Sequence, residues 1–229
     1  WQAGSSSSAF PPEAFDAVGS RVPAPRYEGC PGRCPKAPAT LDAGESPGEN
    51  AGMSSTSDST ILHIRTARAQ PAQQAQDAAM AAALEAICFP PEQAASPMTI
   101  AERMATYADH FWLIEDEGGT LLALVNGLCT NEPNLSDEMY ESPTMHDPDG
   151  AWQMILGVAT APAAQGQGLA TRLLRTVIET TRVHGRQGLV LTCLDDLVPF
   201  YARLGFVDEG LSASHHGGLP WHQMRLTLA

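Results

Sequence analysis

The 229 residues carry 13 Lys and Arg against 26 Asp and Glu, which gives a formal net charge of −13. This acidic balance argues against a nucleic-acid partner, because binding to a phosphate backbone depends on basic patches. No apolar run reaches the roughly 18–20 residues that a membrane span needs, so no membrane partner is predicted.

Five cysteines are scattered along the chain, at Cys30, Cys34, Cys88, Cys129 and Cys193. An odd and dispersed set does not predict a disulfide framework, so we expect a reducing, cytoplasmic environment. Cys30 and Cys34 have neither a second pair nor a nearby histidine, and therefore no metal site is predicted.

Residues 1–58 differ in composition from the remainder. Eight of the 18 prolines lie before residue 50, next to a Ser5–Ser8 run, so few side chains there offset the entropy of ordering. We predict a disordered leader over 1–58, followed by one domain over 59–229. The first residue is Trp1, and Met53 is a candidate translation start. Acidic residues in the leader argue against a transit peptide, although organellar targeting stays open.

Hydrophobic periodicity then predicts the elements of this domain in order. Residues 61–67 alternate as a strand, and Pro71 opens a helix that continues to Cys88. Ser96 and Pro97 form an N-cap and first-turn pair for a helix to Tyr107. Strands are expected over 111–115 and 121–130, joined by the Asp-Glu-Gly-Gly turn at 116–119. The acidic stretch 130–150 contains one short expected helix at 136–140.

The stretch 152–182 organises the rest of the domain. Residues 154–160 read as a buried strand that ends at Ala161-Pro162, and a helix with one apolar stripe begins at Gln165. Strands over 188–193, 206–212 and 222–228 and a helix over 197–204 complete the pattern. Strands that bracket helices in this order predict a single mixed α/β domain.

Glycines at the start of the helix let the backbone approach an anion, which free N–H groups and the helix dipole then hold. No Gly-Lys-Ser/Thr follows, and G-x-G-x-x-G is absent, so neither a P-loop nor a dinucleotide fingerprint is indicated. Gln165-x-x-Gly168-x-Ala170 resembles the pyrophosphate loop of the GNAT superfamily of acyl-CoA N-acyltransferases. The phrase FYARLGF at 200–206, about 30 residues later, resembles a second GNAT motif.

This resemblance implies a mixed, mostly antiparallel sheet flanked by helices, with splayed central strands. The stretch Cys193-x-Asp-Asp-Leu-Val-Pro-Phe-Tyr201 further resembles the arylalkylamine (serotonin) N-acetyltransferase family, which acetylates primary amines from acetyl-CoA, as in melatonin biosynthesis. The resemblance assigns the general acid to Tyr201. It assigns the acetyl-CoA contacts to Val158, Ala159, Thr160, Gln165, Gly166, Gln167, Gly168, Leu169, Ala170 and Thr171.

One departure from that family concerns the organising strand. The vertebrate enzymes carry a His-x-His pair there, whereas the corresponding positions fall among Trp152, Met154 and Leu156. The sequence is therefore expected to be of a non-vertebrate type. Candidate proton acceptors are instead Asp195, Asp196, His146, His215 and His216, although residues of these types in such positions are more often turn, cap or surface residues.

Other residues have two readings as well. Tyr201 suits thiolate protonation because a tyrosine pKa lies close to that of a thiol, but it also reads as a core aromatic. Cys193 suits a core position better than a nucleophile, since it sits in an apolar strand without a paired histidine. Arg172 and Arg175 are candidates for neutralising CoA phosphates, or are solvated helix charges. Backbone N–H groups near Val158 are candidates for polarising the thioester carbonyl.

The resemblance to the arylalkylamine N-acetyltransferase family further implies an acceptor pocket at Phe89, Met98, Met154 and Thr192, with the 89–97 loop and the 211–216 segment. A small primary amine of the serotonin or tryptamine kind is the predicted partner, and the protein is expected to be a monomer or weak dimer. Acetylation of a polyamine, an amino acid or a peptide N-terminus remains the alternative. A non-catalytic CoA-binding sensor is a second alternative.

Overall fold

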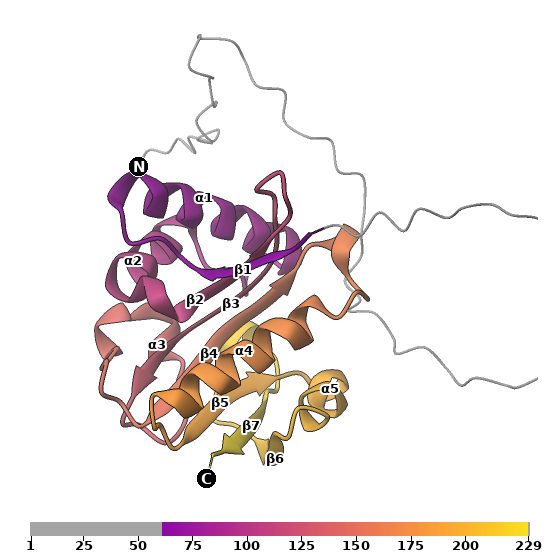
Figure 1. Cartoon of the computed structure of the whole chain (residues 1–229). Coiled ribbons are helices and arrows are strands. Elements are labelled where there is room, and N and C mark those ends of the chain that lie inside the picture. The colour runs from indigo at the N-terminus through magenta and orange to yellow at the C-terminus, as the bar shows by residue number, and fades with distance from the viewer. Residues whose placement is uncertain (1–60, 229) are drawn as a thin grey trace, which may run out of the picture. The chain divides into compact units, whose positions relative to one another are not determined.

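The computed structural model describes residues 61–228. The leader expected over 1–58 lies outside the described residues. Within them, seven strands form one sheet in the order β1-β2-β3-β4-β5-β7-β6 (Figure 1). The strands are β1 His63–Thr66, β2 Phe111–Glu115, β3 Leu121–Thr130, β4 Trp152–Thr160, β5 Gly188–Cys193, β6 Val207–Leu211 and β7 His222–Thr227.

Five α-helices connect these strands in the described chain. They are α1 Pro71–Cys88, α2 Pro97–Tyr107, α3 Glu138–Glu141, α4 Leu169–Val183 and α5 Val198–Ala202. The predicted N-cap of α2 is confirmed, because the Ser96 hydroxyl accepts a hydrogen bond from the Thr99 N–H at 3.0 Å.

All neighbouring strands pair antiparallel except β4 and β5, which are parallel. A parallel pair needs a crossover connection, and α4 supplies it. The predicted mixed, mostly antiparallel GNAT-like sheet flanked by helices is therefore confirmed.

Helices cover both faces of the sheet, and alternation along the strands decides which side chains meet them (Figure 1). Leu124 and Met154 pack with residues of α1 and α2. Their neighbours Val125 and Ile155 pack with residues of α4 and α5 on the opposite face. The interior is thus two hydrophobic layers separated by the sheet.

Two helices start or end differently from the prediction. The helix expected from Gln165 begins at Leu169, because Gly166 and Gly168 both adopt φ of +76°, which an α-helix does not allow. The helix expected over 197–204 is a 3-10 turn at 195–197 followed by α5, and the chain leaves it at Gly205 with φ of +95°.

Candidate active site

The candidate site is centred on an irregularity in β4. Asn126 of β3 pairs with Gly157, but the next residue, Gly127, pairs with Ile155, so Leu156 is an extra residue in β4. Such a bulge locally disrupts the hydrogen-bonded ladder and bends the strand.

β4 and β5 separate at the same level. Their parallel pairing runs from Trp152–Gly188 to Ile155–Leu191 and then stops, although both strands continue. Backbone N–H and C=O groups of β4 beyond Ile155 therefore lack β5 as a ladder partner. The predicted splayed central strands are confirmed, and the opening lies directly beside the bulge.

The loop that leads from β4 into α4 presents backbone rather than side chains. A Cβ on Gly166 or Gly168 would meet no atom within 4 Å, so their positive φ, not crowding, requires glycine. The Arg172 N–H donates to the Gly168 carbonyl at 3.0 Å. That bond is the first of the helix, so the N–H groups of 169–171 lack a partner within α4, as at any helix start. This arrangement suits a phosphate group.

The remaining residues of this loop are positioned by the backbone. The Gln165 side chain donates to the Thr160 carbonyl at 3.2 Å, which ties the loop to the end of β4. Leu169 is buried in the α4 core, while Gln167 is exposed. Arg172 and Arg175 are also exposed, on the first two turns of α4.

Tyr201 lies on α5, on the same side of the sheet as α4. It is buried, and its ring contacts Phe200 and Phe206 edge-on, with centroid distances of 5.0 and 5.9 Å. The ring therefore contributes to the core of this face, which is the second of the two readings from sequence. Its role as proton donor stays a prediction.

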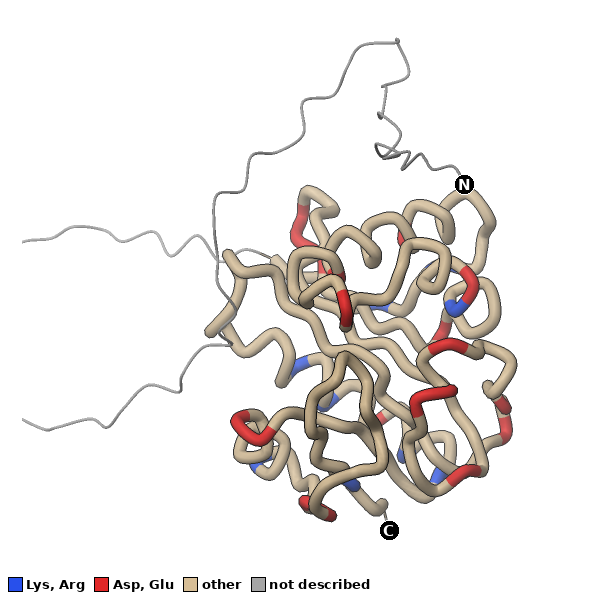
Figure 2. The backbone as a smooth tube through the Cα atoms, turned by 180° about the vertical axis from the view of Figure 1, so that it is seen from behind, with Lys and Arg blue, Asp and Glu red and all other residues tan. Residues whose placement is uncertain are grey.

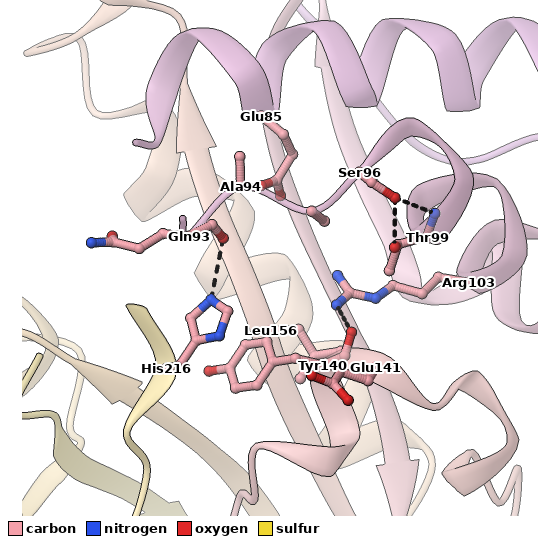
Figure 3. A pocket seen from close by; sticks show the side chains of 11 residues that line it. Glu85, Gln93, Ala94, Ser96, Thr99, Arg103, Tyr140, Glu141, Leu156 and His216 are labelled. Carbon is pink, nitrogen blue, oxygen red and sulfur yellow. Dashed lines mark hydrogen bonds between the residues drawn. The ribbon is translucent and has the colours of Figure 1, made fainter. Parts of the chain in front are cut away.

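A cavity of about 150 Å³ opens on the other side of the sheet, between α1, α2 and the β4 bulge (Figure 3). Its walls come from α1, the loop before α2, α2, the α3 region, β4 and the segment before β7. The lining residues are Glu85, Gln93, Ala94, Ala95, Ser96, Thr99, Arg103, Tyr140, Glu141, Leu156 and His216.

Aromatic and hydrogen-bonding contacts hold the walls of this cavity together. The Tyr140 and His216 rings stack with centroids 4.5 Å apart and planes inclined by 8°. His216 Nε2 lies 3.2 Å from the Gln93 carbonyl oxygen, and the Tyr140 hydroxyl lies 3.0 Å from Thr192 Oγ1 on β5. Through these contacts Tyr140 and His216 join four segments: α3, the segment before β7, the loop before α2, and β5.

Glu85 is the acidic group buried in this cavity wall, and it reaches the backbone of β4. A Cβ on Gly157 would lie 2.8 Å from Glu85 Oε1, so the carboxylate lies against the strand next to the bulged Leu156. The Asn126 amide donates to Glu85 Oε1 at 3.3 Å. Burial raises the pKa of Glu85 to about 7, although the positive charge of Arg103 lowers it. A carboxyl group with this pKa is suited to accept a proton near neutral pH.

Arg103 of α2 lies on the other side of the same amide. Its Nη1 donates to Asn126 Oδ1 at 3.4 Å, and its Nη2 donates to the Tyr140 carbonyl at 2.5 Å. The residue is 4% exposed, and its Nε has no hydrogen-bond partner among the described residues. Glu85, Asn126 and Arg103 therefore form one buried polar chain.

The structure brings few of the predicted acceptor residues to the cavity. Thr192 contacts the cavity residue Tyr140, and part of the predicted 89–97 loop lines the wall. Phe89 ends α1 and packs on the adjacent core, while Met154 is fully buried in that core. Met98 is 71% exposed and does not line the cavity. Their roles in substrate binding stay predictions.

Of the five candidate proton acceptors, His216 lines the cavity. Asp195, Asp196 and His215 are exposed. His146 contacts the His110 ring and the Cys129 N–H, at the end of β3 away from the glycine loop, and burial lowers its pKa to about 4.

The sequence analysis did not identify Glu85 as a site residue, although a signal was present. Glu85 shares the buried face of α1 with Ala78, Ala81 and Ala82, an unusual place for a carboxylate.

Cys193 lies in the core on the α4 side, and burial raises its pKa to about 12. It is therefore a thiol at neutral pH, as expected for a core residue.

Among residues 61–228, no group of three or more His, Cys, Asp or Glu is arranged to hold a metal ion. In the same range no helix is long and apolar enough to cross a membrane.

The sequence matches a family model over the part that contains β4, the glycine loop and Tyr201, whereas Glu85 and Arg103 lie outside that part. Residues 108–208 match the family model of the acetyltransferase (GNAT) domain. A 116-residue stretch is 36% identical to serotonin N-acetyltransferase of Macaca mulatta, over 49% of this chain and 54% of that protein. A 54-residue stretch is 35% identical to glucosamine 6-phosphate N-acetyltransferase 1 of Oryza sativa subsp. japonica, over 24% and 33%. The chain thus spans a third to about half of these relatives.

Solved structures share the fold over most of the described chain. The loading GNATL domain of CurA from Lyngbya majuscula superposes with a TM-score of 0.61 at 16% identity, covering 73% of this chain and 98% of that domain. A GphF GNAT-like decarboxylase in complex with isobutyryl-CoA gives 0.58 at 20% identity, covering 73% and 100%. At such identities the likeness shows the fold alone, which is the GNAT fold. Residues 108–208 are thus similar in sequence to the acetyltransferase (GNAT) domain, and the described chain has the GNAT fold.

Proposed function

We propose that this protein transfers an acetyl group from acetyl-CoA directly to the primary amine of a small arylalkylamine and releases CoA. The observation that carries the proposal is the position of Glu85, a buried carboxyl group in the wall of a cavity beside the β4 bulge. At that level β4 and β5 separate, so a cofactor held on the α4 side has a route to the cavity on the α1 side.

The chain offers acetyl-CoA two sets of backbone groups. The N–H groups of the loop and first turn of α4, from Gly166 to Thr171, are suited to the pyrophosphate. Val158, Ala159 and Thr160, which follow the splay in β4, are suited to the amide groups of the pantetheine arm and to the thioester carbonyl. Gln165 fixes the loop between these two sets.

The chemistry assigns one proton to each side of the sheet. Glu85 accepts a proton from the substrate ammonium, and the free amine then attacks the thioester carbon. A C–N bond forms, and the nitrogen, which then carries one proton more than the amide product, releases that proton to solvent. The C–S bond breaks, and the Tyr201 hydroxyl donates a proton to the departing thiolate. Glu85 and Tyr201 return to their starting states by exchange with solvent. N–H groups near Val158 stabilise the oxyanion formed between these steps.

The cavity wall also favours a particular acceptor. The stacked Tyr140 and His216 rings and the Leu156 side chain offer an apolar surface for an aryl group. Acidic positions are spread over the loops of the described chain and few basic ones lie among them, which favours the approach of a cation (Figure 2). The likeness to serotonin N-acetyltransferase supports the same acceptor class.

The test is an acetyl-CoA-dependent thiol-release assay with a panel of amines. Serotonin, tryptamine, phenylethylamine, spermidine and glucosamine 6-phosphate cover the proposed class and its rivals. We expect turnover of the aryl-bearing amines at a kcat/KM at least tenfold above that for spermidine. Turnover of glucosamine 6-phosphate or spermidine alone would show that the acceptor is not an arylalkylamine. Binding of acetyl-CoA without release of CoA from any amine would indicate a non-catalytic CoA-binding protein.

A further inference from the structure

Arg103 is a buried cation without a buried counter-ion in contact. It is 4% exposed, and no described carboxylate lies within ion-pair distance of its guanidinium. Its two hydrogen bonds go to neutral acceptors, the Tyr140 carbonyl and the Asn126 amide. Its Nε–H has no partner among residues 61–228. A buried charge in this state is costly unless a ligand completes its environment.

The same side chain belongs to the acceptor cavity. Arg103 lines the wall, and its guanidinium points into the space between Glu85, Leu156 and Tyr140 (Figure 3). A guanidinium has five donors and no acceptor, so its natural ligand is an oxyanion, which binds through charge-assisted hydrogen bonds. The Arg103 guanidinium, which has no counter-ion in contact among the described residues, therefore faces the place where the acceptor is proposed to bind.

We propose that Arg103 binds a carboxylate carried by the acceptor next to its amine, so that the preferred substrates are aromatic amino acids rather than bare arylalkylamines. The inference rests on the proposed function and narrows its substrate class. It assigns Arg103 to acceptor specificity and Glu85 to proton transfer, with the Arg103 charge lowering the pKa of Glu85.

The spacing of the two charged groups favours a carboxylate over a more distant anion. Glu85 and Arg103 contact opposite ends of one side-chain amide, that of Asn126. An acceptor whose amine meets Glu85 and whose anion meets Arg103 needs these groups only one or two carbon atoms apart. A 2-amino acid has that spacing. In an amino-sugar phosphate the anion lies much further from the amine.

The first experiment compares matched acceptors on the unaltered full chain. Tryptophan is compared with tryptamine, which lacks the carboxylate, and with tryptophanol, which replaces it by a neutral hydroxymethyl group. Phenylalanine and phenylethylamine repeat the comparison with a smaller ring. We expect kcat/KM for each amino acid to exceed that for its decarboxylated partner at least tenfold. Equal or higher values for tryptamine and phenylethylamine would overturn the inference while leaving the proposed function intact.

The second experiment replaces Arg103 by Gln and by Lys, with Arg182→Gln on the exposed surface of α4 as the matched control. Loss of the Arg103 charge also changes the pKa of Glu85, so the two acceptors are compared as a ratio. We expect Arg103→Gln to lower kcat/KM for tryptophan at least tenfold more than kcat/KM for tryptamine. Arg103→Lys, which keeps the charge but loses the planar fork, is expected to lie between. An equal loss with both acceptors would show that Arg103 serves folding only and would overturn the inference.

Binding of indole-3-propionate, which has the carboxylate but no amine, gives a readout that needs no turnover. Calorimetry should show at least tenfold weaker binding to the Arg103→Gln protein than to wild type and to Arg182→Gln. Binding of glucosamine 6-phosphate, which carries a phosphate instead of a carboxylate, is measured in the same way. Arg103-dependent binding of that compound, without binding of indole-3-propionate, would overturn the carboxylate assignment. If no amine is acetylated but indole-3-propionate binds through Arg103, the proposed function fails and the anion site stands.

Discussion

The two faces of β4 carry the two halves of the candidate active site, and they are built in different ways. On the α4 side, one continuous stretch supplies a strand, a glycine turn and a helix start, whose useful groups belong to the backbone. On the α1 side, the cavity collects side chains from segments spread between Glu85 and His216. The first half therefore depends on chain conformation and the second on particular side chains. Single substitutions should therefore affect the two halves of the site separately.

The largest effect is expected at Glu85. Glu85→Gln keeps the volume and still accepts the hydrogen bond from Asn126, but it removes the carboxylate proposed to take the proton from the amine. We expect kcat/KM to fall roughly 10³-fold, within the usual contribution of a general base, and acetyl-CoA affinity to stay within twofold. Steady-state rates and calorimetry measure the two quantities. The exposed Glu102→Gln is the control. Near-normal rates in the Glu85→Gln protein would contradict the proposed role of Glu85 as the general base.

Tyr201→Phe tests the proton donor on the other face. The ring packing against Phe206 is retained, while the hydroxyl proposed to protonate the thiolate is lost. We expect kcat to fall roughly 10²-fold with little change in acetyl-CoA affinity, because the lost interaction forms only in the transition state. A silent substitution, with the fold intact by circular dichroism, would assign Tyr201 to the core alone.

The raised pKa of Glu85 also predicts a pH-dependent difference in stability between wild type and Glu85→Gln, which can be measured without substrate. Its folded pKa of about 7 lies above the value of 4.5 for a free glutamate, so the folded state binds more protons between these two pH values. Its contribution to the free energy of unfolding is therefore full below pH 4.5 and is lost as the pH rises through 7. We expect Glu85→Gln to be up to about 3 kcal/mol more stable than wild type at pH 8 and nearly equal at pH 4.5.

Urea unfolding at these two pH values makes the measurement, again with Glu102→Gln as control. A stability difference that stays constant between pH 4.5 and pH 8 would mean that the Glu85 pKa is not raised in the folded chain.

The smallest of the single-site effects is expected in the glycine loop. Gly168 adopts a left-handed conformation that a β-branched residue resists, so Gly168→Val should distort the start of α4. We expect acetyl-CoA binding to weaken at least tenfold, which corresponds to about 1.4 kcal/mol. Gly185, which also has positive φ but lies after α4, supplies the matched control as Gly185→Val. Equal affinity of the folded Gly168→Val and Gly185→Val proteins would argue against the phosphate assignment.

These two halves also differ in how far the sequence predicted them. The strand, glycine turn and helix were predictable because their signals are contiguous and fixed by glycine φ angles and apolar spacing. The bulge at Leu156 was not, since it depends on the register between β3 and β4. Arg103 reads in sequence as an ordinary charge on an exposed helix. Its burial follows from the packing of α2 against β3 and the Tyr140 segment, which local patterns do not encode.

The positions of the expected acceptor residues depend on the same tertiary packing. The family resemblance assigned Met98 to the pocket, and the structure places it on the first turn of α2 with its side chain exposed to solvent. Glu85 was overlooked because its partner Asn126 lies 41 residues away. With no histidine pair on the strand, the sequence offered Asp195, Asp196 and three other histidines as proton acceptors, whereas the fold places the Glu85 carboxyl group, with its pKa raised to about 7, at the cavity wall.

The pH dependence of kcat/KM, measured for wild type and Glu85→Gln with one aryl-bearing amine, tests the central claim most directly. A base must be deprotonated to act, so the wild-type value should rise tenfold per pH unit below about 7. Above that pH it should level off until the amine itself titrates. In Glu85→Gln the inflection near pH 7 should disappear, leaving a low rate that follows only the free-amine fraction. An inflection near pH 7 that persists in Glu85→Gln, or is absent from wild type, would contradict the account.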